Sequence, residues 1–273
     1  GTFDDCQNIV KSILIDRDFS EEFSIAAVNS INWSRVMIQI VYYFYTLINN
    51  NISEDEIINF SVPTGNFGDI YAGYVGIKMG LPVNKLIIAT NENDILDRFI
   101  NSGSYSIEGV TKTTSPSMDI AIASNFERLL FDLLQRSSVM TSEKMNELKN
   151  NRSFSVTKEQ SNLVKKTFSS RKINQNEVND LIKETYKEFN YIMDPHTAIG
   201  LGASRVLNER GDNNFILGTA HPIKFSDTVE KAIGHPMQST NEFFEMYKNE
   251  EKFYSFMNSA EEVRKVIKDN YSK

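Results

Sequence analysis

Apolar runs and polar breaks alternate in a way that predicts a βαβ unit over residues 57–90. Residues 57–62 are apolar and partly β-branched, which is typical of a buried strand. Residues 69–79 place apolar side chains at helical spacing, and a second apolar run over 85–90 predicts another strand. Strand, helix and strand in this order predict two parallel strands joined by a crossover helix.

The rest of the chain extends this pattern into an α/β fold. We expect an open, mainly parallel sheet with flanking helices and a helical insert. Helical spacing predicts helices over residues 4–15, 33–47 (a core helix), 119–134 and 195–208, and apolar runs predict a strand over 215–219 and a short one near Phe154. The expected parts are an α/β core over 1–135, a helical insert or subdomain over 136–193, a return to the core over 194–240, and C-terminal surface helices over 241–273.

Composition limits the partners and the compartment. The chain has 273 residues, 40% hydrophobic and 24% charged, so a well-buried core is expected. A formal net charge of −7 disfavours a nucleic-acid or anionic-membrane surface, and the most apolar run, residues 36–48, is too short to span a bilayer. One cysteine, Cys6, excludes an internal disulfide and suits a cytoplasmic location. His196, His221 and His235 are widely separated and give no metal-ligand spacing, so no metal is expected.

The loop before the crossover helix has the features of an anion site. It reads Pro63-Thr64-Gly65-Asn66-Phe67-Gly68-Asp69. The first N–H groups of a helix have no internal partner and its dipole makes that end positive, so a phosphate fits there. Gly65 and Gly68 lack a Cβ and allow an anion to approach the backbone. The loop has neither the G-x-G-x-x-G pattern nor the G-K-[ST] of a P-loop, which disfavours nucleotides. A tight strand-to-helix turn without a ligand is the alternative.

A longer stretch, residues 61–69, resembles the phosphate loop of threonine synthase, a pyridoxal-phosphate enzyme of the tryptophan-synthase-like, fold type II class. Further blocks that resemble this family follow its order over residues 1–235. They are Gly1-Thr2-Phe3-Asp4-Asp5-Cys6, Asn29-Ser30-Ile31-Asn32-Trp33, Ala89-Thr90-Asn91-Glu92-Asn93-Asp94, Ser115-Pro116-Ser117-Met118-Asp119-Ile120, Asp194-Pro195-His196-Thr197-Ala198 and Thr219-Ala220-His221-Pro222.

The resemblance implies pyridoxal 5′-phosphate (PLP) as cofactor and a set of residues that bind it. It places the cofactor phosphate against Gly65, Asn66, Phe67, Gly68 and Asp69. It makes Thr219 the partner of the pyridine nitrogen, a neutral hydroxyl that leaves the ring a weaker electron sink than a carboxylate would. Because a carboxylate repels a phosphate, we expect the Asp69 side chain to turn away and bond loop amides.

The lysine that such a cofactor requires is not assigned in this chain. In threonine synthases the Schiff-base lysine lies upstream of the phosphate loop in a Phe-Lys-Asp-like setting, and no Phe-Lys-Asp occurs here. Lys224 follows the Thr-Ala-His-Pro block, but the family has a lysine there that is not the Schiff-base residue. We therefore expect the catalytic lysine in a missing N-terminal part of the same protein, and we expect this chain alone to be inactive.

For the full-length enzyme the resemblance implies a lyase of threonine biosynthesis. It converts O-phospho-L-homoserine and water to L-threonine and phosphate through a PLP aldimine, γ-phosphate elimination and water addition at Cβ. This small-molecule substrate is a phosphorylated amino acid, so a second anion site is needed. The candidate substrate residues are Asn29, Ser30, Asn32, Arg35 and Lys224, with further polar contacts from Asn91, Asn93, Thr113, Thr114, Ser115, Ser117 and His221.

Two other functions stay open at this point. The first is another fold type II PLP lyase, such as a serine or threonine dehydratase, which the loop alone does not separate from threonine synthase. The second is a non-catalytic protein that binds a phosphate-bearing ligand and has lost its lysine. The Asn-Ser-Ile-Asn, Ser-Pro-Ser-Met-Asp and Asp-Pro-His-Thr blocks favour threonine synthase over the first. A reading frame that extends upstream through a Phe-Lys-Asp-like segment would exclude the second.

Overall fold

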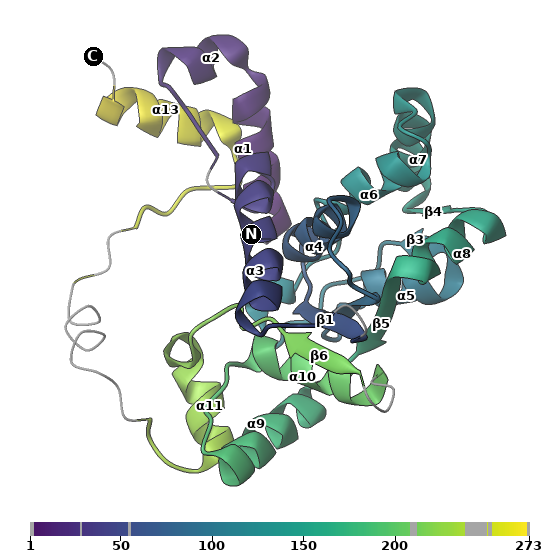
Figure 1. The fold of residues 1–273 in the computed structure, drawn as a ribbon. Coiled ribbons are helices and arrows are strands. Elements are labelled where there is room, and N and C mark those ends of the chain that lie inside the picture. The colour runs from purple at the N-terminus through teal and green to yellow at the C-terminus, as the bar shows by residue number, and fades with distance from the viewer. Residues whose placement is uncertain are drawn as a thin grey trace. The chain divides into compact units, whose positions relative to one another are not determined.

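The structure, a computed structural model, describes residues 3–27, 29–53, 56–207, 212–237, 250 and 253–271 (Figure 1). The chain forms two compact units, one made of Gly1–Asn32 with Gln238–Lys273 and the other of Trp33–Met237. The first unit contains both ends of the chain. The sequence pattern instead predicts that the two ends belong to different parts, 1–135 and 241–273. Within the described residues, no helix is both long and apolar enough to cross a membrane.

The terminal unit is helical. Its described helices are α1 (Phe3–Ile15), α2 (Arg17–Glu22) and α13 (Ala260–Tyr271). The Arg264 guanidinium of α13 lies 5.7 Å from the centre of the Phe19 ring and donates to the Ser12 carbonyl at 3.2 Å. The two ends of the chain are therefore held together by side chains of α13, and the helices expected at both ends are confirmed where the structure describes them.

The larger unit is built on a parallel sheet of four strands in the order β5-β2-β1-β6. All three neighbouring pairs are parallel. The strands are β1 (Ile58–Pro63), β2 (Lys85–Thr90), β5 (Phe168–Lys172) and β6 (Asn213–Ile216). Helix α4 (Gly68–Lys78) joins β1 to β2, which confirms the βαβ unit and the α/β fold class.

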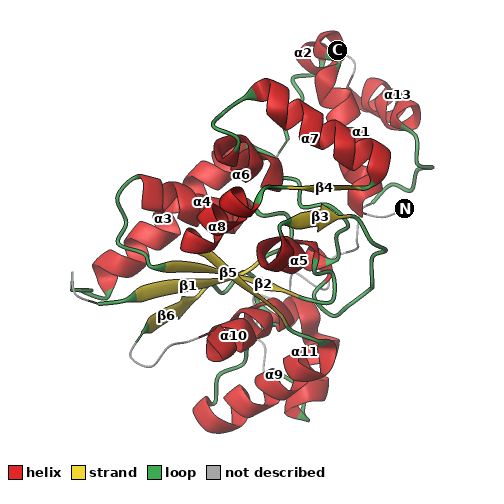
Figure 2. Cartoon of the chain, turned by 90° about the vertical axis from the view of Figure 1, so that its right-hand side faces the viewer, coloured by secondary structure: helices red, strands yellow, loops and turns green. Residues whose placement is uncertain are grey.

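Helices cover both faces of this sheet (Figure 2). They include α3 (Trp33–Asn49) and α4 on one face, and α9 (Gln175–Phe189), α10 (Pro195–Leu207) and α11 (Ser226–Ile233) on the other. Side chains of a strand alternate between faces. Accordingly, Leu86 and Ile88 of β2 join the apolar cluster of α3 and α4, while Ile87 and Ala89 join that of α9 and α10. The central strands are thus buried on both sides.

The segment expected to be a helical insert contributes a strand to the main sheet, so that part of the prediction is wrong. It contains α7 (Ser138–Asn151), β4 (Ser153–Ser155), α8 (Lys158–Thr167), β5 and α9. Strand β4 pairs antiparallel with β3 (Ser104–Ser106), which confirms the short strand near Phe154. Strand β5 escaped prediction because it is a polar edge strand in which only Phe168 and Ser170 are buried.

Two predicted boundaries also shift. The helix expected from residue 119 begins at Phe126, as α6 (Phe126–Leu133), because the Asp119 carboxylate is used to hold the preceding loop. Strand β6 ends at Ile216 rather than 219, since its pairing with β1 covers Ile58–Ser61. Thr219 therefore lies beyond the strand.

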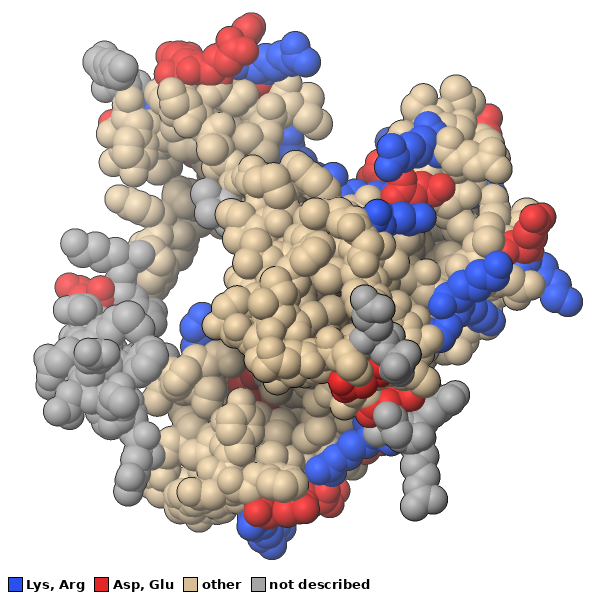
Figure 3. Space-filling view, in the orientation of Figure 1, with Lys and Arg blue, Asp and Glu red and all other residues tan. Residues whose placement is uncertain are grey.

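Helix α3 is buried on one face and apolar on both. Val36, Ile40, Tyr43 and Leu47 are buried, as expected of a core helix. The opposite face exposes further large apolar side chains: Trp33, Met37, Ile38, Val41, Tyr42, Tyr45 and Ile48. Figure 3 shows a mostly uncharged surface where α3 lies in Figure 1. The core helix expected over 33–47 is therefore buried on one face only, because an apolar pattern on all sides does not say which side faces the sheet.

Candidate functional site

The predicted phosphate loop lies at the carboxyl edge of the sheet. Strand β1 ends at Pro63, and the Thr64 amide donates to the Ala89 carbonyl of β2 at 2.8 Å. Phe67 caps α4 in a left-handed conformation, with φ of 63°, and its ring is buried. Such a conformation costs free energy in a non-glycine residue, so the surrounding packing must hold it. The Phe67 ring packs 5.6 Å from that of Phe126 and 5.9 Å from that of Phe168.

Gly65 is required by the segment that lies over the loop. A Cβ at this position would lie 2.6 Å from the Ser117 carbonyl oxygen and 3.1 Å from the Met118 Cα. Both are backbone atoms, so a side chain here displaces the loop instead of a flexible neighbour. The backbone of residues 117–118 therefore sets the position of the phosphate loop.

That segment is itself held by a network of polar side chains, which we call the loop network: Asn91, Asn93, Thr113, Ser115 and Asp119. The Asp119 carboxylate accepts from the Asn91 and Asn93 amides at 2.8 and 2.9 Å, and from the Thr113 amide and hydroxyl at 2.8 and 2.7 Å. Asn91 also donates to the Ser115 hydroxyl at 2.9 Å. These residues, of which all but Asp119 were expected to contact substrate, bond one another and tie the end of β2 to the loop.

Other polar contacts complete the frame around the phosphate loop. The Asn66 carbonyl accepts from the backbone and side-chain amides of Asn125, each at 3.0 Å. The Asn66 side-chain oxygen accepts from the Ser124 hydroxyl at 3.1 Å. Thr114 donates from its hydroxyl to Gln175 at 2.9 Å. The loop is thus fixed by chain segments that are distant in sequence.

Asp69, in the first turn of α4, bonds a tyrosine and not the loop amides expected. The Tyr43 hydroxyl lies 2.9 Å from the Asp69 carbonyl and 3.3 Å from its carboxylate. Tyr43 reaches this position because Gly73 of α4 lets its ring pack against the helix backbone. Burial raises the pKa of Asp69 to about 6, while the Tyr43 hydroxyl and the charge of Arg35 favour the carboxylate.

Thr219 and Lys224 follow β6 at the same edge of the sheet, and both are exposed. Lys224 belongs to a short 3-10 helix, η2 (Pro222–Phe225), which His221 caps by accepting from the Ile223 amide at 3.2 Å. Thr219 and Lys224 therefore offer polar groups to solvent at the carboxyl edge of the sheet.

The remaining substrate candidates divide between the two units. Arg35 lies on α3, close enough to Asp69 to act on its charge. Asn29, Ser30 and Asn32 belong to the terminal unit, where Asn29 accepts from the Ile31 amide at 3.1 Å and Asn32 donates to the Ala27 carbonyl at 2.5 Å. These two asparagines hold the turn in which they lie.

A buried histidine at the start of α10 was not among the predicted site residues. Asp194 accepts from the His196 amide at 2.8 Å, from its ring Nδ1 at 2.9 Å, and from the Thr197 hydroxyl. Burial is the largest single influence on the Asp194 carboxyl and raises its pKa. The hydrogen bonds from His196 and Thr197 together outweigh it, so the pKa is lowered. An aspartate one residue before proline and two before histidine at a helix start is the local signal that predicts such a cap.

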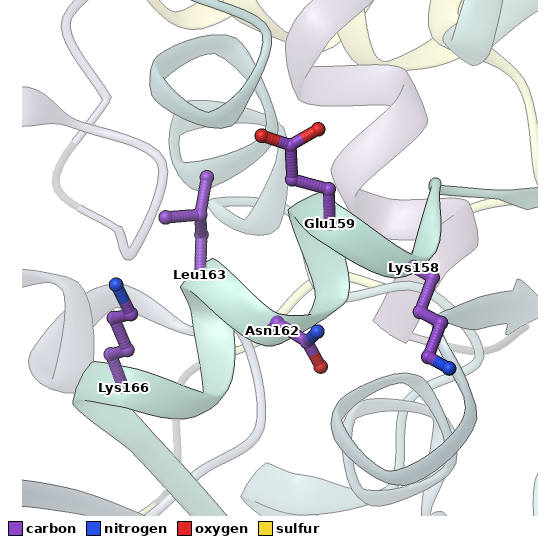
Figure 4. Close-up of a pocket in the computed structure, with 5 residues that line it drawn as sticks. All are labelled: Lys158, Glu159, Asn162, Leu163 and Lys166. Atoms are coloured by element: carbon purple, nitrogen blue, oxygen red, sulfur yellow. The ribbon is translucent and has the colours of Figure 1, made fainter.

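A surface groove lies elsewhere, along α8 (Figure 4). It is lined by Lys158, Glu159, Asn162, Leu163 and Lys166, which all belong to that one helix. It is separate from the carboxyl edge described above. Among the described residues, no group of three or more His, Cys, Asp or Glu is arranged to hold a metal ion.

Several known proteins are similar in sequence to this chain. A family model described as "Threonine synthase, C-terminal" matches residues 197–267. A threonine synthase of Saccharomyces cerevisiae is 44% identical over 252 residues, which are 85% of this chain and 49% of the relative. That of Pseudomonas aeruginosa is 41% identical over 269 residues, 98% of this chain and 57% of the relative. The chain thus spans about half the length of the curated relatives it matches.

Solved structures share the fold. The structure of PLP-bound threonine synthase from Brucella melitensis matches with a TM-score of 0.89 and 40% identity, over 100% of this chain and 59% of that one. Yeast threonine synthase matches with a TM-score of 0.84 and 39% identity, over 98% of this chain and 58% of that one. These comparisons confirm the resemblance that the sequence motifs indicated.

Proposed function

We propose that this chain, a member of the threonine synthase family, binds the phosphate of PLP in the loop Gly65–Asp69. The observation that carries the proposal is the position of the loop: it opens a helix at the carboxyl edge of a parallel sheet, where α/β folds bind ligands. The PLP-bound relative supports PLP as the ligand.

The loop fits a phosphate in shape and in charge. The first intrahelical bond of α4 runs from the Tyr71 amide to the Phe67 carbonyl, so the preceding amides of the first turn point out of the helix end. They provide donors for phosphate oxygens together with the positive end of the helix dipole. The Asp69 carboxylate accepts from the Tyr43 hydroxyl and is not one of the groups proposed to bind the phosphate. The frame around Gly65 and Asn66 holds the loop in shape before a ligand binds.

Thr219 is the proposed partner of the pyridine nitrogen. Bound PLP supplies an electron sink for the amino-acid substrate. A neutral hydroxyl bonds the ring nitrogen without holding a proton on it. The exposure of Thr219, just beyond β6, leaves its hydroxyl accessible from solvent.

The proposed reaction of the full-length protein, in the cytoplasm, is the conversion of O-phospho-L-homoserine and water to L-threonine and phosphate. Arg35 and Lys224 are the proposed cations for the substrate phosphate, and Asn29, Ser30 and Asn32 are proposed polar contacts. The Schiff-base lysine is proposed to lie in an N-terminal part of the protein outside this chain.

The exposed apolar face of α3 supports that last point. A helix with exposed large apolar side chains along one face marks a surface that another chain segment covers. The relatives are longer than this chain. We propose that the segment of the full-length protein that corresponds to their additional length packs on this face.

A titration of this chain with PLP tests the proposal. The visible spectrum reports binding, and borohydride reduction followed by intact mass reports any covalent link. We expect reversible binding without a specific adduct. A stoichiometric adduct on one lysine, with Lys224 checked first, would contradict a Schiff-base lysine outside this chain. Failure to bind PLP would contradict the proposal that the loop Gly65–Asp69 binds its phosphate.

Turnover by the full-length protein separates the remaining alternatives. Threonine formed from O-phospho-L-homoserine supports the proposal. Activity on serine or threonine alone would indicate a dehydratase, and PLP binding without turnover of any of these would indicate a non-catalytic binding protein.

A further inference from the structure

His196 is buried and only partly paired. Its side chain is 3% exposed, and that of Asp194 is 1% exposed. The ring Nδ1 lies 2.9 Å from the Asp194 carboxylate. Among the residues that the structure describes, none bonds the other ring nitrogen, Nε2, which is also shielded from solvent. A buried polar atom without a partner is rare in folded proteins and calls for an explanation.

The bond to Asp194 fixes the state of the ring. A carboxylate accepts hydrogen bonds, so Nδ1 carries a proton and donates it. The Nε2 atom is therefore an acceptor in the neutral ring, and it becomes an N–H donor when the ring takes up a second proton.

The position of His196 along α10 brings it to the ligand edge of the sheet. Helix α10 leads into β6 and so runs opposite to the strands. Its residue Gly200 is level with the end of β1: the Ser61 hydroxyl donates to the Gly200 carbonyl at 2.6 Å, and a Cβ on Gly200 would lie 3.2 Å from the Pro63 ring. His196 comes four residues earlier, about 6 Å further toward the carboxyl edge. That is the level of the phosphate loop.

The segment after β6 lies against the same residues. A Cβ on Gly218 would be 3.8 Å from the Thr197 hydroxyl, and the Phe225 ring centre lies 4.8 Å from that of His196. His196 is thus next to the segment that carries Thr219.

We propose that His196 binds an anionic oxygen of the phosphorylated ligand through Nε2–H, with Asp194 as its positioning partner. This inference rests on the proposed function, because it takes its ligand from there. PLP and O-phospho-L-homoserine present mostly anionic oxygens, which accept hydrogen bonds. An imidazolium paired with Asp194 is the form that donates to them, and ligand binding supplies the partner that Nε2 lacks.

Two variants separate this role from a structural one. In His196→Asn the side-chain amide sits near the place of Nδ1 and keeps the bond to Asp194, but nothing reaches the place of Nε2. In His196→Gln the amide reaches the place of Nε2 and loses the Asp194 bond. If His196 only packs and caps, Asn should substitute well and Gln poorly. A ligand contact gives the opposite order.

The experiment measures the affinity of the chain for PLP, O-phospho-L-homoserine and inorganic phosphate by calorimetry in two buffers of different ionisation enthalpy. We expect tenfold or greater weakening by His196→Asn for at least one probe, smaller weakening by His196→Gln, and proton uptake that the Gln variant lacks. The probe affected tells whether cofactor or substrate supplies the oxygen. On the wild-type chain, the ¹⁵N resonance of His196 Nε2 should shift to the protonated range when that probe binds.

The outcomes distinguish this inference from the proposed function. If the wild-type chain binds PLP while both variants bind every probe equally well and the Nε2 resonance is unchanged, the inference is overturned and the proposed function stands. If the wild-type chain binds none of the three probes, both are overturned. The NMR measurement on the wild-type chain remains decisive if a variant does not fold.

Discussion

Two polar clusters at the carboxyl edge of the same sheet differ in whether their hydrogen bonds are complete. In the loop network each side chain, from Asn91 to Asp119, has partners within the protein. In the pair Asp194 and His196, one buried ring nitrogen has none among the described residues. The completed cluster shapes the backbone that lies over Gly65. The incomplete one is the cluster that has an atom to offer a ligand.

The largest effect is expected from Asp119→Ala, which breaks the completed cluster. It removes the acceptor of the Thr113 amide and one acceptor each of the Asn91 and Asn93 side-chain amides, which keep their bonds to Ser115 and to the Thr111 carbonyl. We expect a loss of about 3 kcal/mol in the free energy of unfolding, measured by urea denaturation, and PLP affinity lowered about tenfold or more, since 1.4 kcal/mol at the loop suffices.

Asp132→Ala is the matched control for that change. Asp132→Ala removes the ion pair with the largely exposed Arg136 at 2.9 Å and one long hydrogen bond from the Tyr71 hydroxyl at 3.4 Å. Exposed ion pairs contribute about 0–1 kcal/mol. Equal losses from the two alanine variants would contradict the view that the loop network shapes the site.

A smaller effect is expected from Gly65→Ala, which keeps the network and disturbs the loop beneath it. The new Cβ would lie 2.6 Å from the Ser117 carbonyl oxygen. We expect about 1–3 kcal/mol of destabilisation and a clear loss of PLP affinity. Gly109→Ala is the control, because a Cβ there meets no atom within 4 Å. If Gly65→Ala binds PLP as the control does, the loop is not the phosphate site.

The smallest effect is expected from Asp69→Asn, and it depends on pH. The pKa of Asp69 is raised from 3.8 to about 6, so the folded state holds this proton more tightly than the unfolded state. Its contribution to stability is present below pH 4, falls as the pH rises to about 6, and is constant above that. We expect an amplitude of about 1 kcal/mol, reduced from the full value of such a shift because the residue is partly exposed.

Urea midpoints of the wild-type chain and Asp69→Asn between pH 4 and 7.5 check this. The wild-type chain should lose stability relative to the variant over pH 4–6. Parallel curves would show that the Asp69 carboxyl is not perturbed.

The part of the fold that the sequence predicts is the part encoded locally. Strands β1 and β2 are apolar runs, and the loop between them has Gly65 where the backbone is crowded, so the βαβ unit follows from neighbouring residues. Strand β5 does not, because its polar residues form a strand only when β2 is beside it. The same holds for α6, which starts late because Asp119 bonds residues up to 28 positions away.

The site divides in the same way. The residues of the phosphate loop are contiguous, so their common location could be predicted. The partners that hold them, such as Ser124 at Asn66 and Tyr43 at Asp69, come from distant segments and carry no local signal. That no described residue bonds the Nε2 of His196 becomes visible only when the neighbours of the ring are known.

The central claim is that the loop Gly65–Asp69 binds the phosphate of PLP. Backbone ¹H–¹⁵N spectra of this chain, recorded with PLP, with inorganic phosphate and with pyridoxal, test it most directly. The amides of Gly65, Asn66, Phe67 and Gly68 should shift with PLP and with phosphate and stay unchanged with pyridoxal, which lacks the phosphate. Shifts confined to the α8 groove around Lys158 and Lys166, with the loop amides unmoved, would contradict the claim.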